Sequence, residues 1–423
     1  MLKNSFVRTA MTFFAVSTPL AAQATDVSAN PRMRAALDMI KADNAWTLDQ
    51  QQSICEIPAP PFKEAARGAE FKKRLEALGL RNVRTDAVGN VIAERPGSGG
   101  GPTVVIAGHL DTVFPEGTDV KVKRAGTRMT APGIEDDCRG LTVLLAVVRA
   151  FEKSGVQTAG TIYFVGDVGE EGPGNLRGMR HLFGTELKGK VDYFITVDGA
   201  GLGVASRAVG SHRYRVTYTG PGGHSYSAFG IPNPIHALGR AMAGISDLQV
   251  PATPKTTFNV GVIEGGTSVN SIAAKASMEV DMRSESAASL QSVDDRIQKI
   301  LKDALAAENA RWTSPAAAKA RLSITIDTIG IRPTGAQADT ARIVRTALAA
   351  ARTLGFTSVT SASSTDANWP ISLGIPAIRI AGGGKGEGAH SLGEWYDDGT
   401  DGWLGPQWAA LLLGMLAGLR PSA

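Results

Sequence analysis

Apolar residues follow two alternating patterns along the first half of the chain. Short runs rich in β-branched residues, at 103–107, 161–165 and 191–197, have the continuous apolar character of buried strands. Between the first two runs, residues 141–153 repeat apolar positions at helical spacing. The alternation continues through residues 33–205 and predicts a sheet flanked by helices.

The pattern changes near Ser206. The next segments read as strand, helix, strand, strand and helix, at 214–219, 234–245, 257–263, 276–282 and 287–306. This order suits a small open sheet with two helices on one face. After a strand at 324–329 the first pattern resumes, with a helix at 338–354, a strand at 377–380 and a helix at 406–419. We therefore expect an α/β fold, in which residues 32–205 and 323–423 form a mixed sheet flanked by helices and residues 206–322 form an inserted α+β lid.

The N-terminus has the features of a secretory signal peptide. A basic start is followed by an apolar stretch at 10–20 and by the small-x-small sequence at 22–24. A membrane anchor needs about 20 consecutive apolar residues, whereas this stretch is shorter and contains Thr12 and Pro19. The sequence predicts that residues 1–24 are removed and that the mature protein is periplasmic or secreted, with no membrane attachment.

Composition and charge narrow the class further. Hydrophobic residues at 43% and charged residues at 20% describe a globular protein with a large core. Without the first 24 residues, 42 basic side chains face 40 acidic ones, which gives no support for a nucleic acid or an anionic membrane as partner. An oxidising compartment would permit a disulfide between Cys55 and Cys138. Two buried free thiols are equally compatible with the sequence.

Chemically active side chains follow the predicted strands. His109 and Asp111 leave a strand end two residues apart, so one can bind a metal while the other orients the imidazole. Asp136 and Asp137 precede the helix at 141–153, where an aspartate either caps the helix or bridges two metals.

Three more candidates follow later strands. Glu170 and Glu171 lie on a glycine-rich turn, where one carboxylate can bind metal while its neighbour accepts a proton. Asp198 ends another strand, and His390 follows three glycines. Two histidines and three carboxylates at strand ends are the ligands that two adjacent zinc ions require.

Taken in order, these motifs resemble the co-catalytic zinc family of peptidase T, glutamate carboxypeptidase, aminoacylase and succinyl-diaminopimelate desuccinylase. The resemblance covers nearly the whole mature chain. It rests on His109, Asp111, Asp136, Asp137, Glu170, Glu171, Asp198, His390 and the lid sequence Gly222-Gly223-His224-Ser225. It implies two Zn²⁺ per subunit, with Co²⁺ or Mn²⁺ as other possible working metals.

The resemblance also implies roles for the metal-site residues. One zinc would be held by His109 and Asp198, and the other by Glu171 and His390. Asp136 would bridge them, Glu170 would be the general base and Asp111 would orient His109. A second alignment places the bridge on Asp137; we prefer Asp136 because the upstream Gly133-Ile134 then also aligns. The family often has a cis peptide at the corresponding pair.

Residues outside the metal site complete the resemblance. His224 would reach a neighbouring subunit's active site and stabilise an oxyanion, which implies a homodimer formed through the lid. Asn270 and Arg283 would bind a substrate carboxylate. Gly383 would offer a backbone N–H to the substrate, although a glycine there also suits a tight turn.

The predicted function is hydrolysis of an amide bond in short peptides by a zinc-bridging water, with Glu170 as general base. The segments at 57–62 and 363–366 are most similar to peptidase T-like members. Carboxypeptidase or N-acyl-amino-acid amidohydrolase activity is the first alternative. An exported zinc-binding or peptide-binding protein without catalysis is an alternative from another class.

Overall fold

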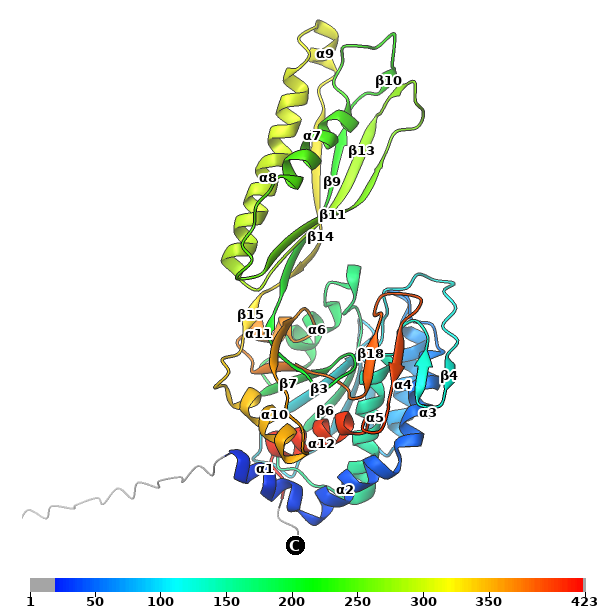
Figure 1. Cartoon of the computed structure of the whole chain (residues 1–423), viewed down its shortest axis with the longest axis vertical. Helices are drawn as coiled ribbons and strands as arrows, with labels where there is room; N and C mark the ends of the chain where they lie inside the picture. The colour runs from blue at the N-terminus through cyan, green and yellow to red at the C-terminus, as the bar shows by residue number, and fades with distance from the viewer. Residues whose placement is uncertain (1–19, 421–423) are drawn as a thin grey trace, which may run out of the picture.

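The computed structural model describes residues 20–420 and consists of two domains connected by two chain crossings (Figure 1). A nine-stranded sheet is the centre of the larger domain, with the order β1-β2-β6-β3-β7-β17-β8-β15 and β16 paired to β8. Its strands are β1 (Asn82–Thr85), β2 (Val91–Arg95), β3 (Val104–His109), β6 (Ile162–Asp167), β7 (Tyr193–Val197), β8 (Val204–Ala208), β15 (Gly335–Ala336), β16 (Thr360–Ser363) and β17 (Ala377–Ile380). The central four, β6, β3, β7 and β17, run parallel, while both ends of the sheet contain antiparallel pairs.

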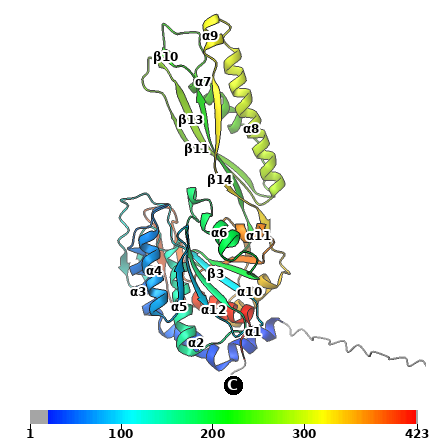
Figure 2. The ribbon, with the colours of Figure 1, turned by 180° about the vertical axis from the view of Figure 1, so that it is seen from behind.

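Helices cover both faces of this sheet (Figure 2). They are α1 (Leu20–Ala29), α2 (Pro31–Ala42), α3 (Asn44–Cys55), α4 (Ala65–Ala77), α5 (Cys138–Ser154), α6 (Arg177–His181), α10 (Arg342–Thr353), α11 (Asn368–Ser372) and α12 (Leu404–Ala417). The helices α5 and α12 are buried over nearly their whole length, because they lie between the sheet and the outer helices. A mixed sheet flanked by helices confirms the predicted fold class.

A second, smaller sheet lies beside the metal-binding candidates. Its order is β18-β19-β5-β4, from β4 (Lys123–Ala125), β5 (Arg128–Thr130), β18 (Lys385–Glu387) and β19 (Trp395–Asp397). The antiparallel pairing of β19 with β5 places the loop that contains His390 next to the loop that contains Asp136.

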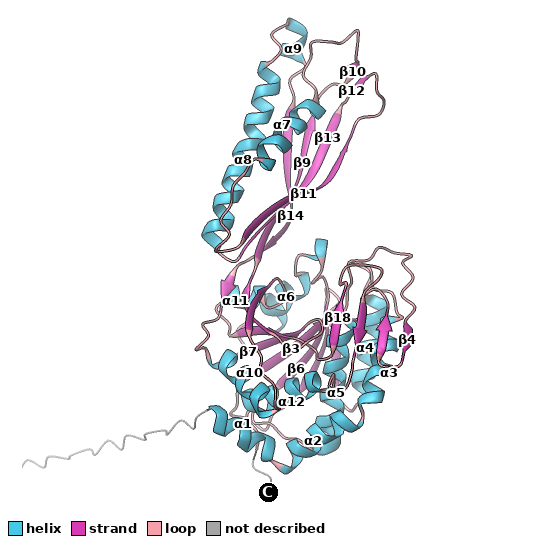
Figure 3. Cartoon of the chain, in the orientation of Figure 1, coloured by secondary structure: helices cyan, strands magenta, loops and turns pink. Residues whose placement is uncertain are grey.

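The lid is an antiparallel four-stranded sheet with helices on one face (Figure 3). The sheet has the order β11-β13-β9-β14, from β9 (Gly210–Thr219), β11 (Thr256–Gly265), β13 (Lys275–Ser284) and β14 (Ser323–Arg332). Two helices, α7 (Pro234–Ser246) and α8 (Ala287–Ala310), bury its apolar face. The short elements β10 (Gly223–His224), β12 (Ser271–Ile272) and α9 (Pro315–Lys319) complete the lid.

The lid extends further along the chain than the sequence predicted. We expected residues from 323 onward to belong to the larger domain, but β14 pairs with β9 from Ser323 to Arg332. The expectation was wrong because the apolar pattern of a strand does not state which sheet the strand joins. In the structure the lid begins at about Gly210 and ends at about Arg332.

The N-terminal prediction is only partly covered by the structure. Residues 1–19 of the predicted signal peptide lie outside the described residues, and Leu20 opens α1, whose Ala24 is buried. Cleavage after Ala24 therefore stays a prediction. Within residues 20–420, none of the helices combines the length and the apolar character needed to cross a bilayer.

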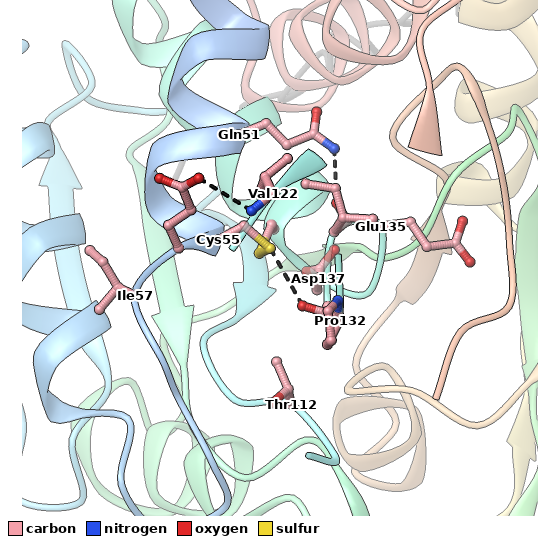
Figure 4. Close-up of a disulfide and its surroundings, with 12 residues drawn as sticks. Gln51, Cys55, Ile57, Thr112, Val122, Pro132, Glu135 and Asp137 are labelled. Carbon is pink, nitrogen blue, oxygen red and sulfur yellow. Dashed lines mark hydrogen bonds between the residues drawn. A yellow bond between two sulfur atoms is a disulfide. The ribbon is translucent and has the colours of Figure 1, made fainter. Parts of the chain in front are cut away.

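Cys55 and Cys138 form a disulfide between the end of α3 and the start of α5, with a Cα–Cα distance of 5.5 Å. The sequence left open whether the two cysteines are free thiols or a disulfide, and the structure has the disulfide. Figure 4 shows Cys55 beside Pro132 and close to Asp137. In the same region, the Gln51 side chain donates a hydrogen bond to the carbonyl oxygen of Ile134. The bridge thus fastens α3 to the start of α5, two residues after Asp136, and the hydrogen bond of Gln51 ties α3 to the loop before Asp136.

Candidate metal and active site

Three of the five predicted metal ligands, His109, Glu171 and Asp198, come from the carboxyl ends of neighbouring parallel strands. His109 is the last residue of β3, Glu170 and Glu171 follow β6, and Asp198 follows β7 directly. Because these strands run in the same direction, their carboxyl ends meet at one edge of the sheet.

Asp136 lies at the centre of this cluster. Its Oδ1 is 2.9 Å from Nε2 of His109, and its Oδ2 is 3.2 Å from Nε2 of His390. The same His390 nitrogen is 2.9 Å from Oε1 of Glu171. Ligand atoms of Asp198 lie within 4.8 Å of those of His109 and Asp136. The structure therefore brings all five predicted ligands together.

The neighbouring Asp137 has a different task. Its Oδ1 accepts a hydrogen bond from the backbone of Gly140 at 2.9 Å, and its Oδ2 accepts one from the backbone of His109 at 3.0 Å. It therefore caps α5 and holds the end of β3, while Asp136 faces the cluster. The peptide bond between the two aspartates is cis.

Asp111 is oriented differently from the expectation. The imidazole Nδ1 of His109 is 3.0 Å from the backbone carbonyl of Asp111 and 3.9 Å from its carboxylate. That carboxylate instead accepts three backbone hydrogen bonds, from Gly169 at 2.8 Å, Glu170 at 3.2 Å and Glu171 at 2.9 Å. The prediction that the Asp111 side chain orients the imidazole is therefore wrong. The backbone carbonyl of Asp111 orients it, because the carboxylate is bound to the turn after β6.

Glu170 is buried beside the cluster and is held by Arg332, a residue that the sequence analysis did not identify. Nη1 of Arg332 donates to Oε1 of Glu170 at 2.9 Å, and Nη2 donates to the Glu170 carbonyl oxygen. Burial raises the pKa of Glu170 to about 8, although Arg332 opposes this shift and Glu171 adds to it. An arginine before a proline at a strand end was the only local signal, and it is a weak one.

Glu394 is a second residue that sequence reasoning missed. It is fully buried, and its carboxylate accepts backbone hydrogen bonds from Gly133 at 2.8 Å, Glu135 at 2.8 Å and Asp136 at 3.0 Å. Burial raises the pKa of Glu394 to about 7. These contacts fix the loop that carries Asp136, and no local sequence pattern indicates them, since the partners are about 260 residues apart.

The charges of the cluster stabilise one another. Burial lowers the pKa of His109, but Asp136, Asp137 and Asp111 outweigh it, so that the pKa lies well above its ordinary value. Hydrogen bonds to Asp136 and Glu171 raise the pKa of His390 to about 10. The imidazoles hold the pKa of Asp136 below its ordinary value despite burial. The carboxylates around the two imidazoles thus favour positive charge between them, which is the place where cations would bind.

A cleft of 810 Å³ separates this cluster from the lid. Arg283, which we predicted to bind substrate, lines it and donates from Nε to Oδ2 of Asp281 at 2.8 Å. Arg213 also lines the cleft, donates to Oδ1 of the same aspartate at 2.8 Å, and reaches the carbonyl of Gly172 in the larger domain at 3.0 Å.

Two predicted residues lie far from this cleft. The exposed His224 pairs with Ser271 in the β10–β12 ribbon, and the exposed Asn270 precedes that ribbon. Figure 1 shows β10 at the end of the lid remote from the larger domain. Within one subunit the structure does not bring His224 and Asn270 to the metal cluster. The role predicted for His224 was already one in a neighbouring subunit's active site, whereas the substrate contact predicted for Asn270 is not formed within one subunit.

The predicted substrate contact of Gly383 is wrong in this structure. Its N–H donates to the carbonyl of Gly201 at 2.8 Å, so it is not available to a substrate. Gly383 has φ +90°, and a Cβ there would lie 2.2 Å from the carbonyl oxygen of Gly402. The glycine is required by a tight turn and close packing, which was the second interpretation of this position.

The donor set fits divalent metal ions, because two imidazoles and four carboxylates converge from three strand ends and two loops. In the described part of the chain, no lysine or arginine is bound to Asp136 or Glu171. The fold and this cluster define a metallopeptidase of the two-domain type. The chain belongs to Peptidase family M20/M25/M40, whose family model matches residues 105–404. It is accordingly a hydrolase that acts on peptide bonds.

Relatives are similar to this chain in sequence, and solved structures are similar to it in fold. The uncharacterized protein YqjE of Bacillus subtilis is 24% identical over 79% of this chain and 90% of its own length. Carboxypeptidase G2 of Pseudomonas sp. is 26% identical over 56% of this chain and 59% of its own length. The fold matches aminopeptidase PepT of Bacillus cereus (TM-score 0.68, 20% identity, 88% of this chain and 98% of that one). It also matches the Bacillus subtilis YXEP protein, described as a dinuclear metal-binding peptidase (TM-score 0.62, 19% identity, 88% and 98%).

Proposed function

We propose that this protein hydrolyses an amide bond in short peptides, with two divalent metal ions, most simply zinc, in the cluster. The observation that carries the proposal is the position of Asp136 between His109 and His390, with Glu170 buried beside them. His109 and Asp198 would hold one ion, Glu171 and His390 the other, and Asp136 would contact both.

The residues of the chain would then divide the reaction between them. Bound metal ions supply an activated water and polarise the scissile carbonyl. Glu170 would accept the proton of that water and deliver it to the leaving amine, because its carboxylate lines the cleft within reach of the cluster. Asp111 would hold the turn that carries Glu170 through its three backbone contacts.

The charges of the cleft favour a substrate that carries a carboxylate. Six carboxylates and four arginines line it. If the carboxylates are ionised and the imidazole of His390 is neutral, as metal binding requires, two divalent ions would give the cleft an excess of two positive charges. The Nε atoms of Arg213 and Arg283 both donate to the carboxylate of Asp281. Among the described residues, the terminal nitrogens of Arg283 have no hydrogen-bond partner, so they could bind an anion. This observation supports a second candidate, carboxypeptidase or N-acyl-amino-acid amidohydrolase activity.

The lid has features that suit a homodimer. The edge strand β11 is exposed along most of its length and carries the apolar residues Val262 and Ile263. An exposed edge strand offers unpaired backbone groups to a second chain. A partner lid would also be the source of His224. We expect a dimer in sedimentation, and His224→Ala to lower turnover without loss of metal. A protein that is active as a monomer would contradict both the dimer and the role of His224 in a partner's active site.

Export is proposed from the N-terminal sequence alone. The mature protein recovered from the periplasm or medium should begin after Ala24, as determined by N-terminal sequencing. A chain that retains Met1 would contradict the proposal.

The function is tested with the purified protein, with zinc added and after chelation. The substrates are free-amine tripeptides, C-terminal glutamyl peptides and N-acetyl amino acids, so that the class cleaved identifies the end recognised. Glu170→Gln should keep both ions and lose turnover by about 10³-fold or more. Exposed Glu387→Gln is the matched control and should behave like the unmodified protein. Binding of two ions without any cleavage would favour the non-catalytic binding protein.

A further inference from the structure

Arg332 occupies the point where the chain returns from the lid to the larger domain. It is the last residue of β14, and its side chain is only 5% exposed. Its guanidinium contacts both the side chain and the main chain of Glu170, and Nη1 also donates to Oγ of Ser364 at 3.1 Å. A buried arginine at this position therefore connects the chain crossing with the carboxylate proposed as general base.

The backbone around Arg332 is held by the larger domain. The N–H of Ile331 donates to Oδ1 of Asn175 at 2.9 Å. The side-chain amide of Asn368 donates to the carbonyl of Pro333 at 3.0 Å. These contacts fix the residues on both sides of Arg332, so its guanidinium has a defined position relative to Glu170.

Glu170 is buried between a glycine turn and a second carboxylate. It follows Gly169, which has φ +74°, and it lies beside the carboxylate of Glu171. Among the described residues, Arg332 is the one that hydrogen-bonds to the Glu170 side chain. A planar guanidinium that binds a carboxylate and the carbonyl of the same residue restricts both the side chain and the main chain.

We propose that Arg332 is a positioning residue, which holds the carboxylate of Glu170 at the metal cluster. This inference rests on the proposed role of Glu170 as general base. Arg332 is not required to touch substrate or metal. Its effect comes from geometry, since a displacement of about 1 Å of a catalytic group can cost about 100-fold in rate.

The first experiment compares Arg332→Met, Arg332→Lys and Arg180→Met in the metal-loaded protein. Arg180 is the matched control, because it donates to the carbonyl of Ile331 at 2.5 Å, one residue away, without contacting Glu170. Arg332→Met should lower kcat by about 100-fold, leave KM within about threefold and retain both metal ions. Arg332→Lys, which keeps the charge but loses the fork, should recover only part of the loss. Millimolar guanidinium chloride should raise kcat of Arg332→Met and leave Arg180→Met unchanged.

The second experiment does not depend on activity. The urea midpoints of the metal-free protein are compared for Arg332→Met, Glu170→Gln and the double variant. If the two side chains interact as described, the double variant loses less stability than the two single losses together. A stability loss in the double variant equal to the sum of the two single losses would show that the two side chains do not interact.

The outcomes separate this inference from the proposed function. An inactive unmodified protein with non-additive midpoints would refute the proposed function and leave the contact intact. If the unmodified protein is active, two results would overturn the positioning role alone. One is a normal kcat for Arg332→Met. The other is an equal loss of kcat in Arg332→Met and Arg180→Met, with no response of either variant to guanidinium.

Discussion

Asp111→Asn tests whether three backbone hydrogen bonds hold the catalytic turn. Oδ1 of Asp111 accepts from Gly169 and Glu170, and Oδ2 accepts from Glu171 at 2.9 Å. Asparagine has one acceptor oxygen and one NH₂ group. In its best orientation it keeps the first two bonds and places its NH₂ group against the N–H of Glu171.

The expected cost follows from these contacts. A hydrogen bond to a charged acceptor contributes about 1.5–3 kcal/mol, and the buried N–H of Glu171 would lose its partner. The two remaining bonds would also become weaker, because a neutral acceptor replaces a charged one. We expect the free energy of unfolding to fall by about 3 kcal/mol. We also expect kcat to fall by about 100-fold, since Glu170 and Glu171 would shift.

Urea unfolding of the metal-free protein measures the first effect, with an unchanged m-value as the condition for comparing midpoints. Steady-state kinetics and metal analysis of the loaded protein measure the second. Asp339→Asn is the control: this aspartate is exposed and has no hydrogen-bond partner among the described residues, so its change should stay within about 0.5 kcal/mol. Equal stability and equal kcat for Asp111→Asn and the unmodified protein would refute the reasoning.

Two further predictions concern stability. The disulfide between Cys55 and Cys138 closes a segment of 83 residues. Replacing both cysteines with serine should therefore lower the free energy of unfolding, measured in urea, by up to about 4.5 kcal/mol. A urea midpoint of the unmodified protein that dithiothreitol does not change would contradict a stabilising disulfide. In the lid, burial raises the pKa of Asp294, but hydrogen bonds from His212 at 2.7 Å and Tyr214 at 2.8 Å outweigh it and hold the pKa below its ordinary value. The ionised carboxylate of Asp294 therefore contributes its full stabilisation above about pH 5, and this stabilisation is lost as the pH falls through the lowered pKa. The free energy by which the unmodified protein is more stable than Asp294→Asn should shrink between about pH 5 and pH 3. An advantage that does not change over this interval would contradict the assignment.

Local patterns predicted much of the fold. The strands at 103–107, 161–165 and 191–197 correspond to β3, β6 and β7, and the helix at 141–153 corresponds to α5. Burial on both faces makes such strands continuously apolar, so their sequences report their environment directly. The family assignment was likewise predicted and is confirmed by the match over residues 105–404.

The order and type of the candidate ligands could also be predicted from the sequence. His109, Glu171 and Asp198 each lie at or just after the end of an apolar strand, and parallel strands bring such ends together. A strand end is a local property of the sequence. Its position next to other strand ends follows from the general geometry of parallel sheets.

Only the tertiary structure decided which partner each of these side chains has. It places Asp136 rather than Asp137 between the imidazoles, gives the carboxylate of Asp111 to the turn after β6, and uses the N–H of Gly383 within the protein. It also brings Arg332 to Glu170 across 162 residues of sequence.

The physical reason is the range of the interactions. Strand and helix patterns arise from periodic burial over a few neighbouring residues, and the amino-acid sequence contains that information directly. Hydrogen bonds of buried polar groups depend on which distant segments meet at 3 Å, and on which donors remain unpaired there. The sequence of this protein therefore determined its class of fold and the identity of its metal-binding candidates, while the folded chain determined how they are held.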